Sequence, residues 1–261
     1  MKKKTALVLG ASGFIGSNLC KFLKHQGYFV RGVDIKLYPY GELQCDEFIQ
    51  GDLCDPKFTN KVMYSPYQTM IPDKNNSFDE VYQLAALMGG ALFIFTGEND
   101  ADVMHNSALI NLNVADAAVK TGIKKLFFSS SACIYPEYNQ MDPNNPKCSE
   151  ESAYPAQPES PYGWEKLVSE IMYQSFARNK GLNVKIGRFH NIFGPGGDYD
   201  TKKAKAPAAL CTKVIRCNDG DSIDVIGPGT QTRSFLYIDE CLEGVRRLMD
   251  CDSFNGPVNI G

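Results

Sequence analysis

Short apolar runs alternate with helical patterns along most of the chain, and this rhythm restricts the fold more than any other feature of the sequence. Six runs are predicted to form strands: "TALVLG", "YFVRGVD", "EFIQGDL", "FDEVYQLAA", "KKLFFSSSA" and "NVKIGRFHN". Helices are predicted at residues 14–27, 103–121 and 161–179. Apolar strands separated by helices are typical of a parallel sheet covered on both faces. The sequence therefore predicts an α/β fold with a doubly wound parallel sheet.

A glycine-rich turn, "GASGFIG", joins the first predicted strand to the first predicted helix. Gly10 permits a tight turn, Gly13 lets the backbone approach a pyrophosphate, and Gly16 lets the helix pack closely against the sheet. The helix N-terminus adds free N–H groups and a positive dipole end, which favour phosphate binding. In this strand–turn–helix context the motif predicts a Rossmann-type dinucleotide site, with Phe14 and Ile15 among its contacts.

Acidic residues end the next two predicted strands. Asp34 closes the second strand, where a carboxylate can accept hydrogen bonds from both ribose hydroxyls and would repel a 2′-phosphate. NAD is therefore the predicted cofactor rather than NADP. Asp52 either contacts the edge of the adenine ring or is a solvated loop aspartate. Leu53 and Ala85 complete the predicted cofactor contacts.

Tyr162 and Lys166 lie four residues apart in "SPYGWEKLVSE", so a helix places them on one face. A free tyrosine has a pKa of about 10, and positive charge from Lys166 and an oxidised nicotinamide is expected to lower that pKa. The phenol could then take a proton from a sugar hydroxyl as hydride leaves the carbon. Both residues are also predicted cofactor contacts. One of the three serines that end the fifth strand, Ser129 to Ser131, could hold the substrate hydroxyl, and Ser131 is the predicted one, although serines there could simply pack against the cofactor.

The composition argues against several classes of protein. A chain of 261 residues fits one large domain, with or without a partial second lobe. The net charge of −3 predicts neither a nucleic-acid nor a membrane partner, and no apolar stretch approaches the ~20 residues of a membrane span. Nine cysteines without a CxxC pair argue against a disulfide framework or a metal site. The expected location is therefore a reducing one, the cytoplasm.

Taken together, these motifs resemble the extended short-chain dehydrogenase/reductase family, whose members act largely on nucleotide sugars. Within it, the order and spacing of "LMGGALFIF", "SSACIYPE", "YGWEK", "GRFHNIFGP", "KAPAA", "QTRSF" and "IDECLEGV" are similar to those of the GDP-mannose 3,5-epimerases. The resemblance implies an NAD-dependent enzyme that converts GDP-mannose to GDP-L-galactose through a 4-keto intermediate. It also implies a GDP-sugar as the bound partner and a homodimer built on the helices near 103–121 and 161–179.

The resemblance gives the cysteine of "SSSACIYPE" a chemical role. Oxidation at C4 of a hexose acidifies the hydrogens at C3 and C5, and inverting either centre needs a base on one face and an acid on the other. By resemblance Cys133 is the base, and Lys205, in "KAKAPAA", is the acid. Lys202 and Lys203 lie nearby, and only the match to "KAPAA" selects Lys205. A free thiol has a pKa of about 8.5, so nearby positive charge is expected to help Cys133 act as a base. The alternative is that Cys133 is an inert, buried thiol.

The resemblance also implies the contacts with the substrate. Gly89 and Gly90 are expected to lie over the hexose, and Asn191 and Gln231 to meet the sugar nucleotide. Arg233 is expected to hold the diphosphate, a task that suits a charged, bidentate donor.

Two domains are expected by the same resemblance. Residues 1–190 are predicted to form the NAD-binding Rossmann domain, and residues 191–261 a partial substrate-binding lobe interleaved with the last elements of the sheet. The lobe is expected to be small and truncated, because the family normally continues well beyond "PVNIG". Leu87 stands where the family usually has an aspartate, and Ala204 where it usually has a glutamate, so either position could alter the sugar pocket.

Other interpretations remain open. An epimerase/reductase like GDP-fucose synthase has a similar "CIYP" run, but it uses a histidine where Lys205 lies and consumes NADPH, which Asp34 disfavours. Another nucleotide-sugar epimerase, acting only at C4, would need no acid and base for C3 and C5. A non-catalytic NAD-binding regulator would not need Cys133, Tyr162 and Lys166 together.

Overall fold

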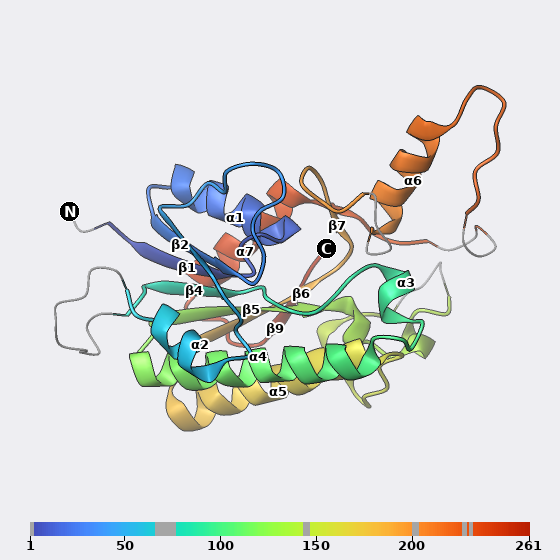
Figure 1. Cartoon of the computed structure of the whole chain (residues 1–261). Helices are drawn as coiled ribbons and strands as arrows, with labels where there is room; N and C mark the ends of the chain where they lie inside the picture. The colour runs from blue at the N-terminus through green and yellow to red at the C-terminus, as the bar shows by residue number, and fades with distance from the viewer. Residues whose placement is uncertain (1–2, 66–76, 143–146, 200–203, 226–228, 230–231) are drawn as a thin grey trace.

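The protein is built on one parallel sheet of seven strands in the order β3-β2-β1-β4-β5-β6-β9 (Figure 1). The structure is a computed structural model that describes residues 3–65, 77–142, 147–199, 204–225, 229 and 232–261. The strands are β1 (Thr5–Leu9), β2 (Phe29–Asp34), β3 (Glu47–Gln50), β4 (Glu80–Gln83), β5 (Lys125–Ser131), β6 (Val184–Phe189) and β9 (Pro257–Ile260). The strand order reverses between β1 and β4, and ligands of open α/β sheets bind beyond the carboxyl ends of the strands at such a point.

Helices cover both faces of the sheet. Figure 1 shows α2 (Pro56–Val62), α4 (Asp100–Thr121) and α5 (Pro161–Lys180) on one side, and α1 (Phe14–His25) and α7 (Ile238–Asp250) on the other. Smaller elements are α3 (Ala91–Ile94), α6 (Ala206–Arg216), the pair β7 (Ile192–Phe193) and β8 (Leu236–Tyr237), and the 3-10 turns η2 (Ala132–Ile134), η3 (Glu137–Asn139) and η4 (Glu150–Ala153). The predicted doubly wound parallel sheet is confirmed.

Two apolar layers result from the alternation of side chains along buried strands. In β1, Leu7 and Leu9 pack into the layer beneath α2, α4 and α5, whereas Ala6 and Val8 pack toward α1 and α7. All five residues of β1 are buried, so this strand runs through the middle of the core. The continuous apolar run "ALVL" therefore packs against both faces at once, as expected of a central parallel strand.

The sequence also fixes where α5 begins and ends. The Ser160 hydroxyl accepts a hydrogen bond from the Gly163 amide, and Pro161 occupies the first turn, where no amide donor is needed. Gly181 ends the helix in the left-handed conformation, with φ of 70°. This start places Tyr162 in the first turn of α5, next to the end of β5.

The last part of the chain returns to the main sheet. β9 pairs with β6, and α7 packs beside α1 on the same face. The last sheet elements therefore come from within residues 191–261, while the boundary between the two predicted domains stays a prediction.

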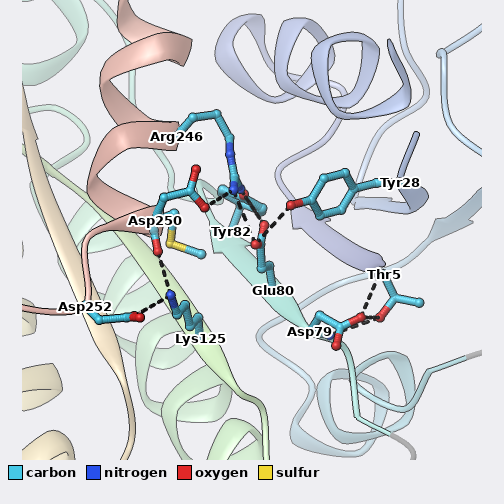
Figure 2. Close-up of polar contacts among 10 residues, drawn as sticks. Thr5, Tyr28, Asp79, Glu80, Tyr82, Lys125, Arg246, Asp250 and Asp252 are labelled. Atoms are coloured by element: carbon cyan, nitrogen blue, oxygen red, sulfur yellow. Dashed lines mark hydrogen bonds and ion pairs between the residues drawn. The ribbon is translucent and has the colours of Figure 1, made fainter. Parts of the chain in front are cut away.

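A buried ion-pair cluster fastens α7 to the start of β4 (Figure 2). Arg246 donates from Nη1 to Glu80 Oε2 at 2.5 Å and from Nη2 to Asp250 Oδ1 at 2.7 Å. The hydroxyls of Tyr28 and Tyr82 both donate to Glu80, at 3.2 and 2.6 Å. Since β4 begins here, the cluster lies at the opposite end of the sheet from the strand ends that carry the predicted site.

Candidate active site

A single cavity of about 1910 Å³ brings together almost all of the predicted site residues. The predicted cofactor contacts that line it are Gly10, Gly13, Phe14, Ile15, Asp34, Asp52, Leu53, Ala85, Tyr162 and Lys166. The predicted catalytic and substrate residues that line it are Gly89, Gly90, Ser131, Cys133, Asn191, Lys205 and Arg233. Gly16 does not line the cavity, and Gln231 lies outside the described residues.

The glycine turn fits a dinucleotide because its backbone has no room for side chains. Gly10 adopts φ of +83°, and a Cβ there would lie 2.8 Å from the amide nitrogen of Ala85. A Cβ on Gly16 would lie 2.1 Å from the carbonyl oxygen of Gly10, so Gly16 packs α1 against the turn rather than facing the cavity. Gly13 is the N-cap of α1 and supplies no side chain to it. The N-terminus of α1 can therefore meet a phosphate directly.

Asp34 is held rigidly at the edge of the cavity. Its Oδ2 accepts a hydrogen bond from the Ser12 amide at 2.9 Å, and its Oδ1 accepts one from the Lys36 amide at 3.1 Å. Ser12 was not among the predicted residues, yet its hydroxyl donates to the Lys36 carbonyl at 2.8 Å and fastens the turn to the end of β2. A fixed carboxylate in this position suits a ribose diol. Asp52 is exposed on the cavity wall and also accepts a hydrogen bond from the Cys54 amide at 2.8 Å. This position is compatible both with contact to the adenine edge and with a solvated loop aspartate.

Tyr162 and Lys166 are both buried, on the face of α5 that meets the end of β5. Lys166 donates from Nζ to the Ser129 carbonyl at 2.9 Å, and its Nζ lies 5.8 Å from the centre of the Tyr162 ring. Burial raises the pKa of Tyr162, the nearby Cys133 raises it further, and a hydrogen bond with Ser131 opposes both. The pKa of Tyr162 therefore moves in the opposite direction to the one expected from Lys166, because desolvation of the phenol is the largest effect. Burial also lowers the pKa of Lys166.

Cys133 lies in the 3-10 turn that follows β5, half-buried and facing the same cavity. Its amide donates to the Ser131 hydroxyl at 3.2 Å. Burial raises the pKa of the Cys133 thiol, whereas Ser131, Lys205 and Arg233 act to lower it. The positive charge expected near this thiol is thus present, but burial outweighs it. Lys205 is half-buried at the start of α6, and burial lowers its pKa while Cys133 raises it.

The remaining predicted substrate residues have local partners as well. Asn191 adopts φ of 41°, in the left-handed region, and donates from Nδ2 to the Ser234 carbonyl at 3.0 Å. Arg233 is exposed and donates to the Thr232 carbonyl at 2.7 Å. Leu87 lies beside Tyr162 in a small apolar cluster with Ile94. The wall next to the phenol is therefore apolar where the family resemblance implies an acid.

Gly163 is a residue of the site that the sequence reasoning missed. A Cβ at this position would lie 2.1 Å from the carbonyl oxygen of Cys133. Only a glycine therefore lets the turn with Cys133 lie against the first turn of α5. The signal was available, since Gly163 directly follows Tyr162 in "SPYGWEKL".

Other kinds of site find no support in the part of the chain that the structure describes. No cluster of three or more His, Cys, Asp or Glu side chains there could hold a metal ion. No helix in the same residues combines the length and apolar character needed to cross a membrane.

Comparison with known proteins agrees with this geometry. Residues 6–261 match the model of the NAD dependent epimerase/dehydratase family. GDP-mannose 3,5-epimerase of Arabidopsis thaliana is 41% identical over 256 residues, and GDP-mannose 3,5-epimerase 1 of Oryza sativa subsp. indica is 40% identical over 256 residues. Each alignment covers 97% of this chain, and the chain spans 63% of the length of each of these relatives.

The fold has close counterparts among solved structures. The UDP-glucose 4-epimerase of Thermotoga maritima, solved with UDP-glucose, superimposes with a TM-score of 0.80 at 25% identity. The superposition covers 98% of this chain and 76% of that enzyme. The match of the family model over nearly the whole chain, together with the glycine turn and the shared cavity, shows that the chain belongs to the NAD dependent epimerase/dehydratase family.

Proposed function

We propose that this protein epimerises a nucleotide sugar with NAD as its cofactor, converting GDP-mannose to GDP-L-galactose through a 4-keto intermediate. The observation that carries the proposal is that Cys133 and Lys205 share one cavity with Tyr162 and Lys166. An epimerase that acted only at C4 would have no use for the thiol and the amine. The likeness to the plant GDP-mannose 3,5-epimerases supports the same substrate and the same product.

The residues of the glycine turn and the end of β2 would hold the cofactor. Gly13 and the N-terminus of α1 would meet the pyrophosphate, and Asp34 would accept hydrogen bonds from a ribose. When bound there, NAD would supply hydride chemistry at C4, as the acceptor and then the donor of one hydride. The reaction therefore has no net redox change.

Tyr162 and Lys166 handle the proton of the C4 hydroxyl. The phenolate form of Tyr162 removes this proton as the carbonyl forms and becomes the phenol, and the Ser131 hydroxyl holds the substrate oxygen beside it. Because burial raises the pKa of Tyr162, the phenol needs added positive charge to act as a base. Lys166 is fixed one turn along the helix by its hydrogen bond to the Ser129 carbonyl and supplies part of that charge.

Cys133 and Lys205 invert the neighbouring carbons. The thiolate of Cys133 removes the proton from C5 or C3, the C–H electron pair enters the enolate conjugated with the C4 carbonyl, and the thiol is formed. The ammonium of Lys205 then gives a proton to the opposite face of the same carbon and becomes the amine. Proton exchange with solvent restores both groups, and reduction at C4 completes the conversion.

The other predicted substrate residues would hold the nucleotide end. Arg233 is exposed on the cavity wall, where its guanidinium could pair with a diphosphate. Asn191 would meet the sugar nucleotide, and Gly89 and Gly90, both buried in the cavity wall, would lie against the hexose.

Product analysis tests the proposed function. The purified protein is incubated with GDP-mannose and NAD, and the nucleotide sugars are followed by NMR. We expect GDP-galactose, with GDP-gulose as the product of inversion at C5 alone. Cys133→Ala and Lys205→Met are expected to abolish both products. Unchanged GDP-mannose under saturating NAD would contradict the proposal.

We also propose that the protein is a homodimer in the cytoplasm. Large apolar side chains are exposed along α4 and α5: Met104, Leu112, Trp164, Val168 and Ile171. Two copies that pair through these helices would bury this surface, and all nine cysteines are free, which suits a reducing compartment. Light scattering should give twice the chain mass for the wild type and the monomer mass for Val168→Asp. A monomeric wild type would contradict the dimer.

A further inference from the structure

A buried chain of polar side chains runs from α5 to β9 directly beside the turn that carries Cys133. At its centre Glu170 and Arg188 form a bidentate ion pair, with Arg188 Nε and Nη2 donating to the two carboxylate oxygens at 3.0 and 2.8 Å. Both side chains are almost completely buried, at 2% and 3% exposed. The Ser130 hydroxyl also donates to Glu170. The mechanism proposed above uses none of these groups.

Tyr135 is the point where this chain meets the catalytic turn. Its hydroxyl accepts a hydrogen bond from Arg188 Nη1 at 3.0 Å and donates one to Asn259 Oδ1 at 2.7 Å. Arg188 Nη1 donates as well to the Glu150 carbonyl at 2.8 Å. The Tyr135 hydroxyl therefore both donates and accepts, and the side chain is 1% exposed, so its position is fixed between β6 and β9.

The turn itself has little freedom. The Tyr135 amide donates to the Ala132 carbonyl at 3.2 Å and closes the 3-10 turn that contains Cys133. On the other side, the Cys133 carbonyl lies so close to Gly163 that a Cβ there would be 2.1 Å away. Cys133 is thus held between the first turn of α5 and the anchored ring of Tyr135.

We infer that Tyr135, anchored by Arg188, is a positioning residue that sets where the Cys133 sulfur meets the sugar ring. Arg188 and Glu170 neutralise each other as a bidentate pair, so the network acts by geometry rather than by adding net charge. A displacement of about 1 Å at a catalytic group can cost about 100-fold in rate. The inference rests on the proposed function, because Tyr135 is taken to influence proton removal at C3 and C5 and not oxidation at C4.

The test compares Tyr135→Phe with the matched control Tyr138→Phe. Tyr138 lies three residues further along, is exposed, and donates to the Pro155 carbonyl at 3.2 Å, so this control also loses one hydroxyl hydrogen bond. Two rates are measured with GDP-mannose and NAD. One is the incorporation of deuterium from D2O at C3 and C5, and the other is the formation of NADH in a single turnover, which reports oxidation at C4. We expect Tyr135→Phe to slow deuterium incorporation about 10- to 100-fold while NADH formation stays within about twofold of the wild type. Tyr138→Phe is expected to match the wild type in both.

Two results would overturn the inference: unchanged deuterium incorporation in Tyr135→Phe, or an equal loss of both rates, since an equal loss means general distortion of the site. A wild type that incorporates no deuterium refutes the proposed function instead. In that case alkylation of Cys133 by iodoacetamide, followed by mass spectrometry of its peptide without any substrate, still tests the positioning. The alkylation rate should change in Tyr135→Phe and not in Tyr138→Phe, and equal rates would refute the inference.

A second variant guards against a folding defect. Asn259→Ala removes the acceptor of the Tyr135 hydroxyl, along with the Asn259 bonds to His190 and the Cys148 carbonyl, but keeps the phenol and its contact with Arg188. It is expected to give the same selective loss of deuterium incorporation at smaller size, and thermal melting confirms that the compared variants are folded. A wild-type exchange rate in this variant would count against anchoring through β9.

Discussion

Replacing Gly163 by alanine tests how closely the Cys133 turn must lie against α5. The added Cβ would be 2.1 Å from the Cys133 carbonyl oxygen, and real Cβ contacts essentially never fall below 3.0 Å, so the two backbones must separate by at least 0.9 Å. Neither side can yield by a rotamer change, because the Cys133 contact is with backbone. A separation of this size between Cys133 and Tyr162 should lower kcat by about 100-fold. The strain should cost about 1–3 kcal/mol, partly offset by about 1 kcal/mol of helix propensity.

The assay is steady-state conversion of GDP-mannose, with urea unfolding to confirm that the variant is folded. Gly244→Ala in α7 is the matched control, because its Cβ would meet a methyl group of the Ile260 side chain, at 3.2 Å, rather than backbone. The control should keep the wild-type kcat and unfold at the same or a slightly higher urea concentration. If Gly163→Ala is folded and retains the wild-type kcat, the close approach of the turn and the helix is not required for catalysis.

Three further predictions concern other parts of the molecule. Lys205→Met removes a charge that lowers the pKa of Cys133. The rate of deuterium exchange rises with pH as the thiolate forms, so this rise should move to higher pH in the variant. A pH profile of exchange that does not move would show that Lys205 does not influence the pKa of Cys133. Asp34→Ser should weaken the binding of NAD, measured by fluorescence titration, about 10- to 100-fold, and the affinity for NADP should rise relative to the affinity for NAD. An equal loss of affinity for both cofactors would contradict the contact between Asp34 and the ribose. Glu80→Gln removes the buried carboxylate that pairs with Arg246 and leaves the exposed Asp250 as the remaining acidic partner. The free energy of unfolding should fall by about 3 kcal/mol, the low end of the range for a broken buried pair, with kcat of the folded fraction unchanged. An unaltered urea midpoint would show that the buried pair does not stabilise the fold.

The sequence was informative wherever a local pattern decides the structure. Runs such as "TALVL" and "LFFSS" are buried on both sides in the sheet, and the spacing of Gly10, Gly13 and Gly16 predicted the turn that the structure contains. The four-residue spacing of Tyr162 and Lys166 likewise sufficed to place both on one face of α5.

Long-range contacts could not be read in the same way. The ion pair of Arg188 with Glu170 joins β6 to α5, and the bond from Tyr135 to Asn259 spans 124 positions of the chain. No local pattern encodes such a partner. The direction of the pKa of Tyr162 was missed for a related reason: spacing placed a cation beside the phenol, but only the fold determines how deeply the phenol is buried.

A crystal structure with NAD and a GDP-sugar tests the central claim most directly, through the positions of Cys133 Sγ and Lys205 Nζ relative to C3 and C5 of the hexose. We expect the sulfur and the nitrogen to lie within about 4 Å of these carbons on opposite faces of the ring, with the Tyr162 hydroxyl at O4. A hexose bound with Cys133 remote from the ring, or with both groups on one face, would contradict it.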